Sequence, residues 1–149
     1  MKGRENYEIQ DKHKLICMYT DCIHMIENGE DKVLCDNREK KIIFQSIELD
    51  NYVVSIEEKS SGLFTADSIV KIINVGNKNT HEYIVDSVTK EMYSYSNIIA
   101  LNLGTEVEFI NTGGWLVKRY IANQEITDVV VSSNLAGIIY RDKIEIINL

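Results

Sequence analysis

The stretch NIIALNLGTEVEFIN (Asn97–Asn111) contains two short apolar segments joined by a tight turn. The same pattern recurs in three further places, the last of them with an insertion: 134–148, 13–26 and 51–74. The last three copies along the chain are evenly spaced, since 37 residues separate the successive equivalent residues Val70, Val107 and Ile144, whereas Ile23 of the first copy lies 47 residues before Val70. A repeat of roughly 40 residues made only of strands is typical of a β-propeller blade.

The composition favours strands along the whole chain. Of the 149 residues, 22 are Ile and 12 are Val, and such β-branched side chains fit the pleated surface of a sheet. Glu106 and Glu108 alternate with Val107 and Phe109, which predicts a strand with one face buried and the other exposed. We therefore expect an all-β chain without helices.

The repeats divide the chain, taken as one domain (1–149), into four consecutive antiparallel propeller blades. Their expected limits are about 5–36, 41–86, 90–121 and 125–149. The first three blades have room for four strands each, whereas the last lacks its outer strand. We expect the chain to be part of a larger β-propeller whose other blades belong to a parent protein. The alternative is that a second copy of the chain supplies the other half.

The last expected strand, at 143–148, leaves an open edge on the fourth blade. Unpaired backbone groups along an edge strand are a template for pairing with another strand. The segment carries few charges that would discourage such pairing. We therefore expect homo-oligomers to form through the open edge of the fourth blade.

Glycines mark the turn before the outer strand in the first three blades: Gly29, Gly76 and Gly113. Each follows an Asn directly or after one residue, and both residue types tolerate the positive φ of tight hairpin turns. We interpret these glycines as structural corners. Trp115 follows the third corner, and we expect its ring to be packed against the adjacent blade. The alternative is contact with a cofactor.

The charge of the chain disfavours nucleic acid as a partner. The formal net charge is −7, and the 16 Lys and Arg residues are scattered, whereas a phosphate backbone is bound by clustered cations. No apolar run approaches the ~20 residues of a transmembrane helix, and the first residues lack the apolar region of a signal peptide. We expect no membrane insertion by this chain, while its compartment stays open.

No motif predicts catalysis, a metal or a cofactor. Cys22 and His24 share one face of an expected strand and Cys35 lies on the next, but a zinc site needs four ligands, or three and a water. Buried thiols and a packed histidine are the preferred interpretation. Ser87 and Lys90 match the Ser-x-x-Lys spacing of penicillin-recognising enzymes, but that chemistry needs a helix, and this segment joins two strands.

The copy at 51–74 contains an insertion of about nine residues between its two strands. The insertion includes Gly62, Leu63 and Phe64, flanked by polar residues. It is expected on the face of the propeller that carries the connections between blades, and propellers commonly bind through this face. We predict that these three residues form an apolar tip that contacts a partner. The alternative is a longer hairpin with no role in binding.

The last third of the chain reads NIIALNLGTEVEFINTGGWLVKRY at 97–120, QEITDVVVS at 124–132 and AGIIYRDKIEIINL at 136–149. It resembles the C-terminal end of an uncharacterised family of bacterial propeller-like domains, which is similar to quinoprotein and WD-repeat propellers. The match continues in register back to His13. Family members usually carry one membrane-spanning helix before the propeller. The resemblance implies a membrane-anchored parent with the propeller outside the cytoplasm, and it implies no activity.

The function favoured by the sequence is a non-enzymatic binding or scaffolding module that presents one loop face to a protein or cell-envelope partner. The alternative is a fragment of a quinoprotein-like or hydrolytic propeller enzyme whose catalytic residues lie in other blades. The expected fold does not decide between them, because propellers carry function in loops on a common frame.

Overall fold

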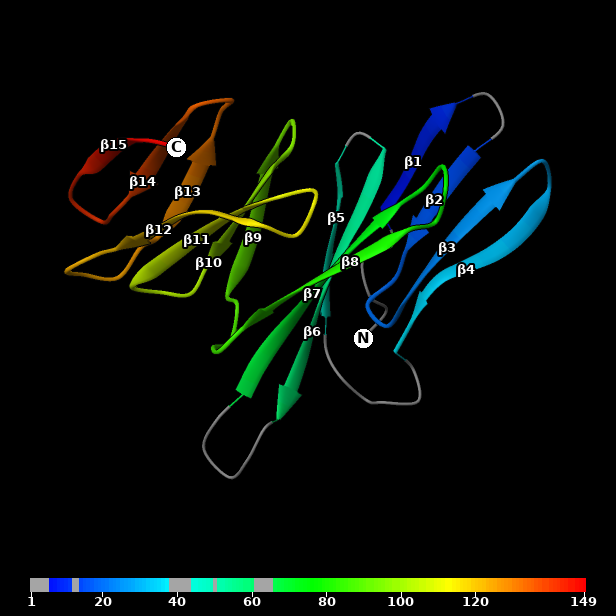
Figure 1. Ribbon diagram of the computed structural model, residues 1–149, viewed down its shortest axis with the longest axis horizontal. Coiled ribbons are helices and arrows are strands. Elements are labelled where there is room, and N and C mark those ends of the chain that lie inside the picture. Colours follow the sequence, from blue (N-terminus) through cyan, green and yellow to red (C-terminus); the bar gives the residue numbers. More distant parts are fainter. Residues whose placement is uncertain (1–5, 12–13, 38–43, 50, 61–65) are drawn as a thin grey trace.

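The computed structural model describes residues 6–11, 14–37, 44–49, 51–60 and 66–149. These residues form four antiparallel sheets and no helix, which confirms the all-β prediction. No helix that could cross a membrane occurs in this described part of the chain. The sheets follow one another along the chain, from blade 1 at the blue end of Figure 1 to blade 4 at the red end.

Each blade is a meander in which consecutive strands pair. Blade 1 contains β1 (Asn6–Asp11), β2 (Lys14–Met18), β3 (Cys22–Glu27) and β4 (Glu30–Asp36). Blade 2 contains β5 (Phe44–Leu49), β6 (Tyr52–Ser60), β7 (Ala66–Asn74) and β8 (Thr80–Val85). Blade 3 contains β9 (Glu91–Tyr95), β10 (Ile98–Asn102), β11 (Glu106–Asn111) and β12 (Leu116–Ile121). Blade 4 contains β13 (Asp128–Val131), β14 (Leu135–Ile139) and β15 (Ile144–Asn148), with no fourth strand among the described residues.

The apolar core lies between successive blades rather than within one sheet. Three clusters of buried side chains fill these spaces: Ile16, Ile23, Met25, Val53 and Ile73 between blades 1 and 2; Val54, Val70, Ile72, Ile99 and Ile110 between blades 2 and 3; Ala100, Val107, Phe109, Val129 and Ile138 between blades 3 and 4. Blades 2 and 3 thus depend on their neighbours to cover both of their faces.

Both faces of β11 are buried, which differs from the predicted half-buried strand. Val107 and Phe109 face blade 4, while Ile110 packs in the cluster shared with blade 2. Glu108, on the same side as Ile110, has an exposed fraction of only 3%. The alternation of apolar and acidic residues therefore separates two interfaces, not an interface from solvent.

The predicted corners form turns, but positive φ occurs at only one of the three glycines. Gly29 has φ 82°. In the other two turns the positive φ lies elsewhere, at Lys78 (63°) and at Gly114 (77°), and neither Gly76 nor Gly113 adopts it.

The Asn residues shape the other two corners through their side chains. Asn74 Oδ1 accepts the Gly76 N–H at 2.9 Å. Asn111 Oδ1 accepts the Gly113 N–H at 2.9 Å and the Trp115 N–H at 3.1 Å. These are Asx turns, in which the side chain imitates a backbone carbonyl. A Cβ at Gly113 would lie 3.2 Å from Asn111 Oδ1, so the glycine permits this close approach.

Trp115 is not packed against the adjacent blade, and the prediction that it would be is wrong. Its exposed fraction is 73%. The ring lies over its own turn, since a Cβ at Gly113 would lie 3.0 Å from Trp115 Cδ1. Gly114 makes the contact with blade 2 instead, because a Cβ there would lie 3.3 Å from the Cβ of His81 in β8. The backbone of the turn, not the indole, approaches the neighbouring blade.

The insertion lengthens the β6–β7 hairpin. The two strands pair continuously from Tyr52 opposite Asn74 to Ser60 opposite Ala66. Figure 1 shows this hairpin reaching well beyond the ends of the other sheets. The predicted binding residues Gly62, Leu63 and Phe64 lie outside the described residues, so their role stays a prediction.

Candidate functional site

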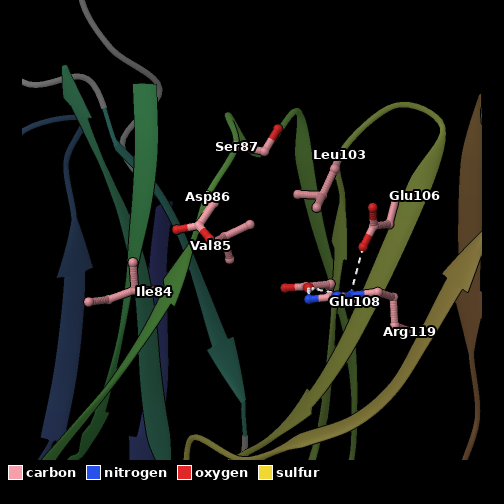
Figure 2. A pocket seen from close by; sticks show the side chains of 8 residues that line it. All are labelled: Ile84, Val85, Asp86, Ser87, Leu103, Glu106, Glu108 and Arg119. Carbon is pink, nitrogen blue, oxygen red and sulfur yellow. Dashed lines mark hydrogen bonds and ion pairs between the residues drawn. The ribbon is translucent and has the colours of Figure 1, made fainter. Parts of the chain in front are cut away.

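A pocket of about 230 Å³ lies between blades 2 and 3. One wall is formed by the end of β8 and the residues after it, and the other by β11, β12 and the turn before β11. The lining residues, shown in Figure 2, are Ile84, Val85, Asp86, Ser87, Leu103, Glu106, Glu108 and Arg119. We call this the interblade pocket. Its lining combines three carboxylates with one guanidinium.

Glu108 is the most firmly held of these groups. Arg119 donates to Glu108 Oε1 through Nε at 2.8 Å and through Nη2. Tyr83 donates its hydroxyl to Glu108 Oε2 at 3.0 Å. Arg119 Nε also lies 2.8 Å from Glu106 Oε1. Both oxygens of the buried carboxylate are thus hydrogen-bonded, as a buried charge requires, and the hydrogen bond to Glu108 raises the pKa of Arg119.

The same arrangement recurs between blades 3 and 4. Tyr120 on β12 donates its hydroxyl to Glu145 Oε2 on β15. Tyr120 follows Tyr83, and Glu145 follows Glu108, by one 37-residue repeat. We call the two pairs tyrosine–glutamate bridges. Each joins the outer strand of one blade to the third strand of the next. The hydrogen bond to Glu145 raises the pKa of Tyr120.

The bridges are not among the features predicted from the sequence, although the sequence contains a signal for them. Equal spacing of Tyr and Glu in two successive repeats marks equivalent places on the blades. Only the docking of one blade on the next shows that the two places meet.

The Tyr83 bridge predicts a specific loss of stability at alkaline pH. Burial, and then the hydrogen bond to Glu108, raises the pKa of Tyr83 from 10.0 to about 12. A group whose pKa is raised on folding stabilises fully below its unfolded pKa, and this contribution is lost as the pH rises through the folded pKa. Stability should therefore fall between pH 10 and about 12, and the Tyr83→Phe variant should lose less over this range. Urea midpoints at about pH 9 and about pH 11 measure this, and equal losses in both proteins would contradict it.

The interblade pocket adjoins the β6–β7 hairpin. Ser68 in β7 is fully buried. Its Oγ donates to the carbonyl oxygen of Ser87 at 2.7 Å and accepts the Thr89 N–H at 3.0 Å. These bonds hold the segment after β8, which is one wall of the pocket, against β7 at the end of its pairing with β8, where the hairpin begins to extend beyond that strand. The pocket wall and the hairpin are thus joined by hydrogen bonds.

The residues considered for a metal are held apart. Cys35 packs in the cluster between blades 1 and 2, where its Sγ lies 3.8 Å from Ser55 Oγ. His24 Nδ1 instead lies 2.8 Å from Asp31 Oδ1. The three cysteines are buried and free of disulfides. Within the residues that the structure describes, no group of three or more His, Cys, Asp or Glu could hold a metal ion.

The two residues of the Ser-x-x-Lys match do not both line the interblade pocket. Ser87 lines the pocket, but no histidine that could activate its hydroxyl group does. Lys90, the other half of the Ser-x-x-Lys match, forms an ion pair with Glu125 at 2.6 Å. The segment that contains Ser87 and Lys90 is not helical, so the geometry needed for that chemistry is not formed.

Solved propellers share this fold at low sequence identity. BamB from Moraxella catarrhalis matches with a TM-score of 0.55 and 14% identity, over 95% of this chain and 41% of BamB. Hsv2 from Kluyveromyces marxianus matches with a TM-score of 0.58 and 15% identity, over 99% of this chain and 49% of Hsv2. No family model and no curated protein matches the sequence.

The chain spans less than half the length of either propeller. At such identities the likeness shows the fold alone. The described residues form four consecutive antiparallel blades of a β-propeller, the last with three strands.

Proposed function

We propose that this chain is a non-enzymatic binding or scaffolding module whose partner is a protein. The observation that carries the proposal is the β6–β7 hairpin, which reaches beyond the other sheets (Figure 1) next to the interblade pocket. Its strands have nine residues each, whereas the second and third strands of the other blades have five or six. The interblade cores do not require this additional length.

The hairpin leads to a direct prediction for Leu63 and Phe64. The Leu63→Ser/Phe64→Ser double variant should lose its partner while its urea midpoint stays that of the wild type, because the proposal assigns these two residues to binding and not to the core. The measurement is crosslinking of the native protein in its own cells, followed by identification of the crosslinked species. The Ile121→Ser variant, altered at an exposed apolar residue of β12, is the control. Identical crosslinks in wild type and double variant would contradict this role for the hairpin.

The alternative, a fragment of a quinoprotein-like or hydrolytic enzyme, makes a different prediction. A quinoprotein parent binds quinone and calcium, and a hydrolase turns over ester or peptide substrates. The module proposed here does none of these. Absorbance of the native protein, calorimetry with calcium and quinone, and hydrolysis of generic esters separate the two functions.

We further propose that the partner is a cell-envelope protein and that the parent is membrane-anchored with its propeller outside the cytoplasm. The support is the resemblance of residues 97–149 to bacterial propeller-like domains. Fractionation tests this, since the native protein should sediment with membranes and be cleaved by protease added to cells with a permeabilised outer barrier. A protein that is fully protected and stays in the supernatant would contradict it.

The open edge of β15 supports a homo-oligomer as part of the same proposal. Among the described strands, β15 pairs only with β14. Addition of a strand from a second copy is one arrangement that this edge permits, because unpaired backbone groups there are available for pairing. Hydrogen exchange tests it, since the amides of 144–148 should gain protection as the protein concentration rises.

A further inference from the structure

The face of blade 4 that points away from blade 3 is apolar and uncovered. Ile144 and Ile146 have exposed fractions of 63% and 67%. They line a hollow of about 300 Å³ together with Val130, Leu135, Gly137 and Ile139. Single exposed apolar residues are normal, but a contiguous group of them marks an interaction surface.

Equivalent residues in the other blades form covered interfaces. We call the side of a blade that points to the next blade its forward face, and the other side its rear face. Each forward face has three equivalent residues, which are fully buried, or nearly so, in the first three blades: Ile16, Ile23 and Met25; Val54, Val70 and Ile72; Ala100, Val107 and Phe109. Gly137, Ile144 and Ile146 follow the blade 3 residues by 37 positions. The forward face of blade 4 therefore has the pattern of an interface between blades.

The opposite end of the row of sheets carries the rear face of blade 1, which is partly exposed, although Cys17 and Cys22 on this side are buried. His24 pairs with Val33 across β3 and β4, so their side chains share one side of blade 1. That side is opposite to Met25, which faces blade 2. Val33 has an exposed fraction of 52%, and Leu15, His24 and Ile26 are partly exposed. Figure 1 places blades 1 and 4 at opposite ends of the molecule.

We propose that the forward face of blade 4 binds the rear face of blade 1 of a second copy, so that two chains close one ring. Natural propellers have about four to eight blades. Two copies of this chain, with four blades each, have a number of blades at the upper end of that range. One copy spans 41% and 49% of the two solved propellers, so two copies have nearly the length of one. Contacts between unlike faces are heterologous, and they close into a ring when the rotation between copies permits.

This contact is separate from the edge of β15. It joins side chains of two sheet faces and repeats the packing already present between blades, whereas the edge would pair through the backbone. A charge placed on the face removes the first contact and leaves the backbone groups of β15 in place.

The test is the mass of the full chain in solution, measured by light scattering at micromolar concentration. Wild type should be a dimer. Ile146→Lys and Val33→Lys should each raise the dissociation constant by about 100-fold or more, because a charge enters an apolar interface. Ile121→Lys, altered at an equally exposed residue of β12 outside both faces, should remain a dimer. Circular dichroism should show the same sheet content in all four proteins, since every substituted residue is exposed.

Mixing the two monomeric variants tests the polarity of the contact. Ile146→Lys keeps an intact rear face and Val33→Lys keeps an intact forward face, so the mixture should regain dimers held by one interface. A wild-type monomer would overturn the proposal. Further blades in a longer chain would give this result. A dimer that survives Val33→Lys would also overturn it, because blade 4 would then be pairing with itself or through the edge of β15.

Discussion

Replacing Phe109 by Ala should lower the free energy of unfolding by about 3–5 kcal/mol. Phe109 is fully buried in the cluster between blades 3 and 4, with Val129 and Ile138 among its members. Removing the ring deletes apolar contacts and leaves a cavity between two pleated sheets that can close only in part. Urea denaturation followed by circular dichroism measures the loss, and an unchanged m-value would show that only stability changed.

Trp115→Ala is the matched control for this prediction. The residue is also aromatic and lies in the same blade, but its ring is mostly exposed. Its removal should change the free energy of unfolding by less than about 0.5 kcal/mol. If Trp115→Ala lost as much stability as Phe109→Ala, the ring would hold the blades together after all.

The fold could be predicted because its signals are local. The strand predicted from the alternation at 106–109 lies within β11, and the equal spacing of Val70, Val107 and Ile144 reflects equivalent places in three blades. Alternation along a strand shows which residues share a side. It does not show what covers that side, and this is why Glu108 was expected to be exposed.

The features that were predicted wrongly or not at all are contacts between neighbouring blades. Trp115 was placed in an interface by its residue type, but the positive φ of Gly114 brings backbone to that interface instead. Tyr83 and Glu108 lie on different blades, and nothing within either strand indicates that they meet. Such contacts depend on how the sheets dock, which a pattern within one repeat does not encode.

Glu108→Ala should lower the free energy of unfolding by about 2–4 kcal/mol, from the lost hydrogen bonds and the cavity left in a buried place. Glu106→Ala is the control, since Glu106 lies two residues away on the same strand and also pairs with Arg119. Its side chain is partly exposed, so its loss should cost less than about 1 kcal/mol. Equal effects in urea denaturation would contradict the distinction between the two carboxylates.

The Glu108→Leu variant separates the volume of the side chain from its charge. Replacing a buried ion pair by apolar groups of similar size is often neutral, because charges are costly to desolvate, whereas removing one partner is costly when the other charge stays buried. Arg119 is half-exposed, so it can turn to water and Glu106 when Glu108 is lost. We therefore expect Glu108→Leu to unfold near the wild-type urea concentration, well above Glu108→Ala. That result would indicate that the main role of the carboxylate is to orient Arg119 and Tyr83 at the interblade pocket. Equal losses of stability in Glu108→Leu and Glu108→Ala would indicate instead that the carboxylate stabilises the fold.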